Sequence, residues 1–506
     1  MSEDTTTPDV QVEVTGPHVL DPTQLTASGR VGRLWRDRAA HVVRGVSPPT
    51  MALGTRTEGD ASVSQREARA VIDLALRVGE AMLSTGAPSS ESVATVLRLM
   101  EAYGVRSAHV DITFTSITVS IHRGLHEDPL SVMRVIPGRS PDYTRLEGVQ
   151  ALVDDVVRSV AVGAVPMEID VARSRLTRLL KAPHPYRRWV VTAGNALIAV
   201  GVVVLFGAGP VTWLLAALSA AVVDQVQRVL YNAGVAAFFA QAVSAAVPAA
   251  IAMPLFWAMG RDIDVPGVDS PSLVVISGIV VLLAGLGLMG AAQDALDGYY
   301  VTAGARGLEV VLMTAGIAVG IAVVLGLANR LDIDMDVSPF VMLGGLPFVG
   351  ALGSMLVALG FCLITYSGPR TMAIAMLISG LAWLTFEAAL LLGLGGAGSV
   401  AVAAVPAGAL AYAAHRRFRV PELAVATASI VALLPGLAVY RSIYLILANS
   451  PAVVGNAVIH FVSAVTTGLA LAAGLSIGGF LVRRRFGLDR AALRARRRSR
   501  SGYITG

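Results

Sequence analysis

The sequence has little charge for its length. Charged residues make up 15% of its 506 residues, whereas about 25% is usual in soluble domains. Hydrophobic residues account for 54%, and the mean hydropathy is +0.66. This composition excludes an ordinary soluble protein, and with it the fibrous, disordered and disulfide-scaffold classes.

Reactive side chains are also scarce. The single cysteine, Cys362, lies in an apolar run, which excludes a disulfide framework and a cysteine zinc site. The single lysine, Lys181, precedes Ala182, so the Gly-Lys-Ser/Thr of a Walker A loop is absent. His122 and His126 have a spacing seen in metal sites, but it falls on a predicted loop, where the two imidazoles would not converge. We therefore expect neither a metal nor a cofactor.

The charge that exists is unevenly distributed. Residues 189–482 hold 21 of the 75 Asp, Glu, Lys and Arg side chains. Residues 1–188 carry 22 acidic and 22 basic groups and are neutral. The basic excess lies at the end, in Arg483–Arg485 and Arg494–Arg500. This placement indicates contact with anionic membrane lipids and argues against nucleic acid as a partner.

The polar part is predicted to contain a tail and a small domain. Residues 1–63 lack apolar periodicity and carry no signal peptide, so we expect a disordered tail. Ser64 and Glu67 form a capping box that opens the domain, predicted over 64–165 with an α+β fold. The strand-like run 109–121 changes its alternation phase, which predicts a bulge or a tight reversal.

A linker, residues 166–187, has one apolar stripe at helical spacing and several basic residues elsewhere. Such an amphipathic helix could lie in the membrane interface. A surface helix of the soluble domain explains the same pattern equally well.

Ten apolar stretches follow, each about long enough to cross a bilayer. The chain is thus predicted to be a mainly α-helical polytopic membrane protein. Basic residues favour the even-numbered loops and both flanks, which predicts that the N- and C-termini are cytoplasmic. Five spans are predicted in 188–328 and five in 338–482, and a basic tail follows at 483–506. The ten predicted spans are 188–207, 210–227, 234–258, 272–291, 307–328, 338–366, 370–392, 398–414, 422–447 and 453–482.

An internal similarity links two of these spans. Ile279–Leu286 in the fourth span matches Ile430–Leu437 in the ninth at six of eight positions. If the unit of five spans is repeated, its odd number requires the second copy to be inverted, as in many secondary transporters. Chance similarity among common membrane residues is the alternative.

At this point the chain resembles the bacterial threonine/serine exporter family. The resemblance rests on Gly86–Ser92, Met100–Gly104, the Val110–Ile121 run and the order of a soluble domain before ten spans. It implies export of small hydroxy amino acids, threonine and serine, from the cytoplasm across the bacterial inner membrane, driven by the proton motive force. It also implies that the chain is not an enzyme. A related branch associated with dicarboxylate export leaves the substrate open.

A second class of function is a membrane-anchored enzyme or sensor that uses the soluble domain. Its support is one polar strand face, formed by His109, Asp111, Thr113 and Thr115. No Gly-x-Ser-x-Gly or His-Glu-x-x-His motif accompanies that face. Homo-oligomerisation is left open by the sequence.

Ionisable residues inside spans are costly, so they are candidates for the transport pathway. Glu387, Arg441 and His460 fall at similar depth in the outer half of the predicted membrane. We predict that Glu387 pairs with Arg441 and that His460 titrates beside them. Alternatively, Arg441 and His460 extend to the outer interface.

A second group of candidates lies on the predicted inner side: Asp224, Asp294, Asp297 and Glu309. Together they would form an acidic vestibule. Ordinary acidity of cytoplasmic loops is the alternative explanation.

Helix breakers supply the last candidates. Backbone groups freed at membrane depth must be buried in protein or face water, and a zwitterionic amino acid needs such groups. The predicted site-forming breaks are Gly344, Gly345 and Pro347 in span six, and Pro435 and Gly436 in span nine. Packing kinks would produce the same pattern.

Overall fold

The computed structural model describes most of the chain between residues 64 and 486. Every described residue belongs to one compact unit. The predicted tail 1–63 and residues 487–506 lie outside the described ranges. These ranges are 64–105, 108–121, 128–136, 138–263, 265–268, 270–283, 285–335, 347–435, 438–439, 441–442, 445 and 451–486.

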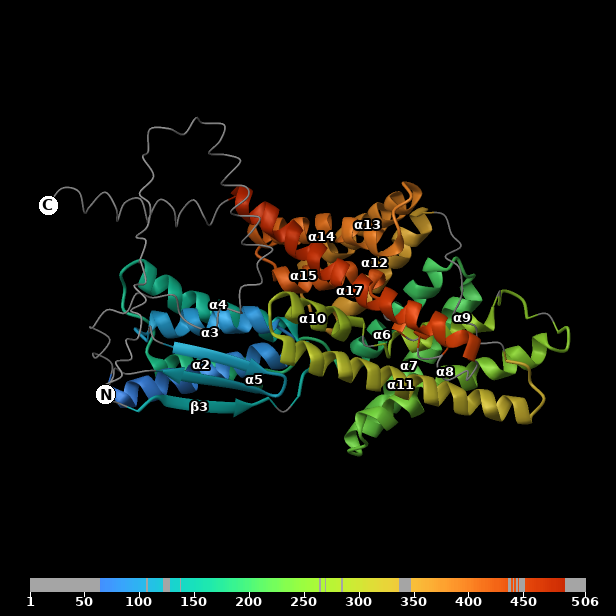
Figure 1. Ribbon diagram of the computed structural model, residues 1–506, viewed down its shortest axis with the longest axis horizontal. Coiled ribbons are helices and arrows are strands. Elements are labelled where there is room, and N and C mark those ends of the chain that lie inside the picture. Colours follow the sequence, from blue (N-terminus) through green and yellow to red (C-terminus); the bar gives the residue numbers. More distant parts are fainter. Residues whose placement is uncertain are drawn as a thin grey trace, which may run out of the picture. The chain divides into compact units, whose positions relative to one another are not determined.

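The polar part forms a small α+β domain (Figure 1). Its three strands form an antiparallel sheet in the order β1-β2-β3. Ile112 faces Ile117 and Thr113 faces Ser116, so the change of phase is a tight reversal rather than a bulge. The elements are α2 (Gln65–Ser84), α3 (Ser89–Ala102), β1 (Ala108–Thr113), β2 (Ser116–Ile121), β3 (Leu130–Val135), α4 (Tyr143–Ala161) and α5 (Ile169–Lys181).

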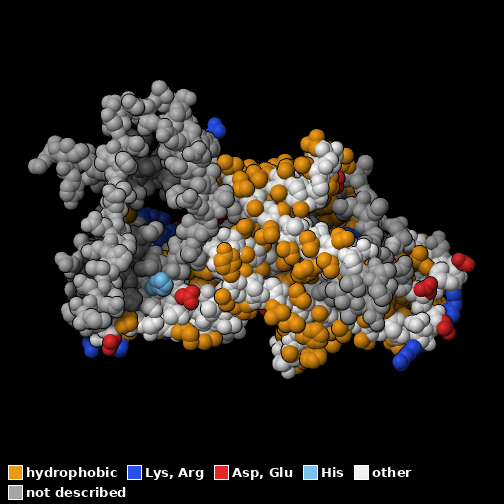
Figure 2. All heavy atoms as spheres, viewed as in Figure 1, with side chains coloured by type: hydrophobic (Ala, Val, Ile, Leu, Met, Phe, Trp, Pro, Cys, Tyr) orange, Lys and Arg blue, Asp and Glu red, His pale blue; other side chains and the backbone are white. Residues whose placement is uncertain are grey.

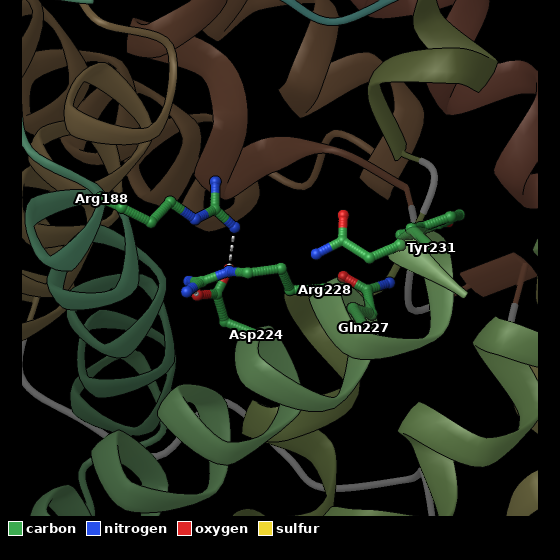
Figure 3. A pocket seen from close by; sticks show the side chains of 6 residues that line it. Arg188, Asp224, Gln227, Arg228 and Tyr231 are labelled. Atoms are coloured by element: carbon green, nitrogen blue, oxygen red, sulfur yellow. Dashed lines mark hydrogen bonds and ion pairs between the residues drawn. The ribbon is translucent and has the colours of Figure 1, made fainter. Parts of the chain in front are cut away.

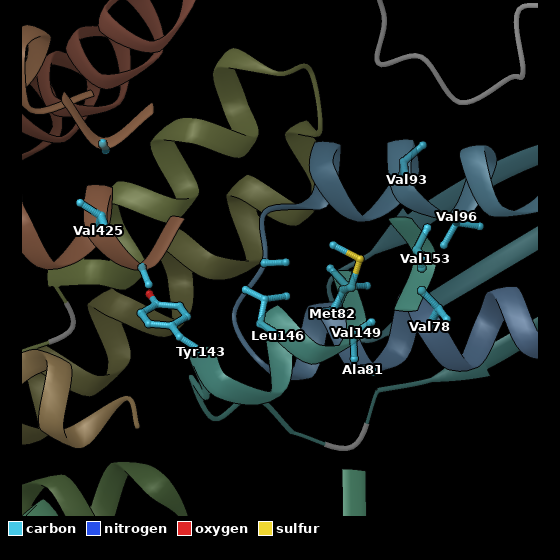
Figure 4. Packing of buried hydrophobic residues seen from close by; sticks show 14 of the residues in the cluster. Val78, Ala81, Met82, Val93, Val96, Tyr143, Leu146, Val149, Val153 and Val425 are labelled. Atoms are coloured by element: carbon cyan, nitrogen blue, oxygen red, sulfur yellow. The ribbon is translucent and has the colours of Figure 1, made fainter. Parts of the chain in front are cut away.

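Local sequence explains how the domain is held together. The predicted capping box is confirmed, because Ser64 Oγ accepts from the Glu67 amide while Glu67 Oε2 accepts from the Ser64 amide. Apolar faces of α2, α3 and α4 form the core, as Figure 4 shows for Met82, Val96 and Val149. All three side chains are completely buried.

The amphipathic segment is a helix, α5, that packs on the soluble domain. Ala172 and Leu176 on its apolar stripe are each 1% exposed, and α5 contacts both α2 and α4. Arg173 pairs with Asp73 of α2 at 3.1 Å. Of the two predicted locations, the structure therefore shows the surface of the domain.

Within the described residues, eight helices are long and apolar enough to cross a membrane, and a ninth crossing is present if one bent pair counts as a single span. Hydrophobic side chains gather over the visible face of this helical part (Figure 2). The chain is thus a polytopic, mainly helical membrane protein. The eight helices are α6 (Arg188–Leu205), α7 (Pro210–Asn232), α8 (Ala237–Met259), α11 (Tyr300–Arg330), α12 (Pro347–Ile364), α13 (Pro369–Leu391), α14 (Gly396–Phe418) and α17 (Pro451–Phe486).

The two remaining predicted spans contain helix breaks. The fourth consists of α9 (Pro271–Val280) and α10 (Gly285–Leu296), which are bent by 46°. The ninth begins with α15 (Glu422–Ile430) and continues as one 3-10 turn, η3 (Val431–Leu433). The two matching octapeptides, Ile279–Leu286 and Ile430–Leu437, thus both lie where a helix ends inside an apolar span.

The segments that follow these two breaks lie close together. Leu288 of α10 packs in one small cluster with Ala438 and Val439, which come after the second break. Val310 of α11 and Ala464 of α17 complete the cluster. When the octapeptide alignment is extended by two residues, Leu288 is equivalent to Val439, so two equivalent positions lie in the same cluster.

Helices α6 and α12 cross at four glycines. A Cβ at Gly194 would lie 2.9 Å from the Gly360 carbonyl oxygen, and one at Gly201 would lie 2.8 Å from that of Gly353. The residue numbers run in opposite directions along the contact, so the two helices are antiparallel. Only residues without a Cβ permit this approach, which resembles the small-residue crossings of other membrane helices.

Other contacts occur twice. α6 contacts α7 and α9, as α12 contacts α13 and α15. α8 contacts α7, α9 and α11, as α14 contacts α13, α15 and α17. Even the glycine contacts recur: a Cβ at Gly320 of α11 would meet the Ala242 carbonyl oxygen of α8, and one at Gly478 of α17 would meet that of Val405 in α14.

Candidate functional site

A buried carboxylate, Asp224 of α7, receives four donors where α6 leaves the soluble domain. Arg188 Nη2 and Asn195 Nδ2 donate to its Oδ1 at 3.0 and 2.9 Å. Thr192 Oγ1 and Arg228 Nη2 donate to its Oδ2 at 2.6 and 2.9 Å. The Asp224 side chain is 6% exposed. Because two cations face one carboxylate, the group carries a net positive charge.

Helical spacing assembles this group. Arg188, Thr192 and Asn195 are separated by four and three residues, so they share one face of α6. Asp224 and Arg228 are four residues apart on the facing side of α7. The contact between α6 and α7 then brings the two faces together.

A cavity of about 440 Å³ opens beside Asp224 (Figure 3). Two guanidinium groups border it, while the Asp224 carboxylate is already occupied by its four donors, so the cavity offers partners chiefly for the carboxylate of a zwitterion. Its lining consists of Arg188, Asp224, Gln227, Arg228, Tyr231 and Asn232.

A line of amides leads from this cavity to the break between α9 and α10. Gln227 Nε2 donates to Gln241 Oε1 of α8 at 2.9 Å, and Gln241 Nε2 donates to the Leu282 carbonyl oxygen at 3.0 Å. Gln241 is 6% exposed. The unwound carbonyl is thus satisfied by a side chain, as membrane depth requires.

Asp294 and Asp297 lie against the soluble domain rather than beside the cavity. The Ser89 amide at the start of α3 donates to Asp294 Oδ1 at 3.3 Å, and Ser90 Oγ donates to Asp297 Oδ2 at 2.6 Å. Arg306 Nη1 of α11 lies 3.1 Å from Asp294 Oδ2. The Asp294 side chain is fully buried and that of Arg306 is 13% exposed.

Burial controls protonation around this contact. Desolvation raises the pKa of Asp297, and the hydrogen bond from Ser90 opposes the rise. Burial also lowers the pKa of Arg139, in the loop before α4, to about 10, with the nearby Arg306 adding to the effect. Arg139 is thus a charged group of the soluble domain that lies near Arg306 of α11 and Asp294 of α10.

The predicted outer cluster is brought together in part. Ser442, next to Arg441 in the chain, donates its hydroxyl to the Ala457 carbonyl oxygen of α17 at 2.8 Å, so Arg441 lies in the same region as His460. Glu387 lies on α13 and is partly exposed. No ion pair of Glu387 occurs in the part of the chain that the structure describes. Its pairing with Arg441 stays a prediction.

The other predicted residues have varied positions. Glu309 is exposed on α11 and acts electrostatically on Tyr231 of the cavity wall. Pro347 begins α12, and Pro435 follows η3 in a turn. Five predicted residues lie outside the described ranges: His122, His126, Gly344, Gly345 and Gly436.

Sequence reasoning missed the uncharged members of the site. The prediction rests on ionisable residues and helix breakers, so it does not include Thr192, Asn195, Gln227 and Gln241. Amides inside predicted spans would have been a usable signal, since an unpaired amide is also costly there.

Polar groups and broken helices inside a multi-pass helical membrane part are typical of membrane transporters. Residues 73–328 match the family described as "Putative threonine/serine exporter", and residues 350–481 match "Threonine/Serine exporter, ThrE". The chain belongs to the threonine/serine exporter family.

Two curated relatives are similar over most of their length. The "Probable threonine/serine exporter" of Mycobacterium tuberculosis (strain ATCC 25618 / H37Rv) is 35% identical over 87% of this chain and 81% of its own. The "Threonine/serine exporter" of Corynebacterium glutamicum is 33% identical over 82% and 83%. No solved structure matches the chain. The chain is therefore an amino-acid exporter of the membrane, related to bacterial proteins.

Proposed function

We propose that this protein exports threonine and serine across the bacterial inner membrane and is driven by the proton motive force. The names of the two relatives support the substrates. The observation that carries the proposal is the cavity at Asp224, which is connected by Gln227 and Gln241 to a broken helix. The two arginines of the cavity suit the carboxylate of a small zwitterion.

The proposed architecture consists of two inverted five-helix repeats that make up ten spans. The antiparallel glycine crossing of α6 and α12 and the contacts that occur twice support it. In such transporters, one repeat rocks against the other around a central site. The domain side, which contains the Asp224 cavity, is proposed to face the cytoplasm together with both termini.

Transport by purified full-length protein in proteoliposomes tests this function. Labelled threonine, serine and succinate are supplied separately, with and without an imposed pH gradient. We expect threonine and serine flux that rises several-fold with the gradient, and no succinate flux. Succinate flux alone would indicate the dicarboxylate branch, and absence of all three would contradict export.

Glu387 and His460 are proposed to carry the coupled proton, with Arg441 as the ion-pair partner of Glu387. The hydrogen bond from Ser442 to the Ala457 carbonyl supports the nearness of Arg441 and His460, and a carboxylate at similar depth would complete a titratable group. Glu387→Gln should reduce gradient-driven flux about tenfold while leaving exchange of threonine across the membrane in place. If this variant retains full flux and its full pH dependence, Glu387 is not part of the proton route.

A further inference from the structure

The break between α9 and α10 lies near the middle of its span. α9 has 10 residues and α10 has 12, so at 1.5 Å per residue each half covers roughly half of a 30 Å hydrocarbon core. The carbonyl end of α9 and the amide end of α10 meet there. These ends carry partial negative and positive charge, respectively, which is the pattern needed to hold an ammonium and a carboxylate.

Side chains of two other helices converge on the end of α9. Pro248 of α8 and Ser219 of α7 both face Gly278, since a Cβ there would lie 2.6 Å from Pro248 Cβ and 2.8 Å from Ser219 Oγ. Gln241, on the same face of α8 as Pro248, reaches Leu282. Ser244 lies between Gln241 and Pro248 on that face, because residues three, four and seven apart share one side of a helix.

Two buried hydroxyl groups near the end of α9 form no hydrogen bond within the described part of the protein. Ser219 and Ser244 are each fully buried, and neither Oγ has a hydrogen-bond partner among the described residues. A buried polar atom without a partner costs about 1–3 kcal/mol. In contrast, Ser277 of α9 donates its hydroxyl to Val274 of its own helix at 3.0 Å.

We propose that the carbonyl end of α9, together with Gln241, Ser219 and Ser244, binds the ammonium and the side-chain hydroxyl of the exported amino acid. The ammonium is held by the Leu282 carbonyl and Gln241 Oε1. The two serines take the substrate hydroxyl. The Gln227–Gln241 hydrogen bond separates this site from the cavity, so the substrate must replace it on entry. This inference rests on the proposed function and adds the place and the chemistry of substrate recognition.

The test compares threonine with 2-aminobutyrate, which is threonine without its hydroxyl. Both labelled amino acids are supplied to proteoliposomes of the full chain. Ser219→Ala/Ser244→Ala should lower the preference for threonine over 2-aminobutyrate about tenfold or more, because a site built to bind a hydroxyl discriminates strongly through it. Gln241→Leu should raise the KM of both amino acids about tenfold, since both carry the ammonium.

Ser277→Ala is the matched control and should leave both quantities unchanged, because its hydroxyl serves its own helix. Should the alanine variants fail to fold, Ser219→Cys and Ser244→Cys make the same comparison with nearly the same volume. Wild-type flux combined with an unaltered preference and KM in the variants would overturn this site. Absence of threonine and serine flux in the wild type would instead contradict the proposed function.

Discussion

At the scale of single residues, Asp224 shows why so few charges suffice in the membrane part. Its carboxylate is buried, yet each oxygen accepts two hydrogen bonds. A buried charge of this kind is tolerated only when it is paired and fully hydrogen-bonded. The two arginines that pair with it also line the cavity. The same side chains therefore stabilise the α6–α7 contact and give the cavity a positive charge.

Asp224→Asn should destabilise the protein much more than Arg188→Gln. The asparagine leaves Arg228 and Arg188 without their counter-ion, at a cost of about 3 kcal/mol. Arg188 is 48% exposed, and its loss leaves three donors on Asp224, so about 1 kcal/mol or less is expected. Thermal unfolding in detergent measures both variants. Equal losses would contradict the central role of Asp224.

Two glutamates of the soluble domain should respond to pH in opposite ways. Burial, and then the nearby Glu422, raises the pKa of Glu91 from 4.5. Its contribution to stability is therefore complete below pH 4.5 and is lost as pH rises through the raised pKa. For exposed Glu67, hydrogen bonds with Ser64 lower the pKa from 4.5, so its contribution is present above that value and is lost as pH falls through the lowered pKa.

Substitution of each glutamate by glutamine should reveal these opposite pH dependences of stability. Glu91→Gln keeps an acceptor for Gln150 Nε2 and should stabilise the protein at pH 7 by about 1 kcal/mol, the size of one poorly solvated polar group. Glu67→Gln should destabilise it at pH 7 and have no effect at pH 3. Unfolding midpoints between pH 3 and 8 measure both. A Glu91→Gln effect independent of pH would refute the assignment.

At the scale of elements, close helix crossings organise the membrane part. α6 and α12 approach through four glycines, and α8 and α14 each receive glycines of a partner helix. The hydrophobic effect does not drive helices together in lipid. Close van der Waals packing between backbones, which small residues permit, is therefore a main source of their affinity. The broken elements α9–α10 and α15–η3 are packed among these crossings.

Gly360→Ala should weaken the α6–α12 crossing. The added Cβ would lie 2.5 Å from the Gly194 carbonyl oxygen, and this overpacking should cost about 1–3 kcal/mol. Gly326→Ala on α11 is the control, since a Cβ there meets nothing within 4 Å; it should change stability by less than about 1 kcal/mol. Unfolding in detergent measures both. If Gly360→Ala is as stable as the control, the crossing is not close.

The positions of helices and strands could be predicted from the sequence better than the contacts between distant residues. Apolar runs gave α6 and α13 because length and hydropathy are local properties, and the phase change before Ile117 gave the strand reversal. The position of Asp294 was not predictable, because its partner Ser89 is 205 residues away. The role of Gln241 is not predictable for the same reason, because it depends on which carbonyl group the neighbouring helix leaves unpaired.

A second internal similarity links spans two and seven. Gly209-Pro210 begins α7 with Thr212 two residues on, and Gly368-Pro369 begins α13 with Thr371 at the same spacing. Proline suits the first turn of a helix, which has no use for its missing N–H. The match that was found, between spans four and nine, lies at the helix breaks and so has a structural counterpart.

At the scale of the whole molecule, the soluble domain contacts the helices that surround the α9–α10 break. α3 binds Asp294 and Asp297 at the end of α10, and Thr302 Oγ1 of α11 donates to the Ile112 carbonyl of β1 at 3.3 Å. Because the domain is attached at these points, a movement of α10 should be accompanied by a movement of the domain. We expect its attachment and the transport cycle to be coupled.

Asp294→Asn and Asp297→Asn should show how much of this attachment depends on the ion pair of Asp294 and how much on the hydrogen bond of Asp297. Asp294→Asn leaves the 13%-exposed Arg306 without its partner and should cost about 3–5 kcal/mol, with threonine flux reduced at least tenfold. Asp297→Asn keeps an acceptor for Ser90. Because burial raises the pKa of Asp297, the neutral amide should be tolerated, and its relative stability should increase as pH rises above 3.8. Unfolding midpoints and proteoliposome flux, measured at pH 5 and 8, compare the two variants. Full flux and stability in Asp294→Asn would show that the soluble domain and α10 are not coupled through this ion pair.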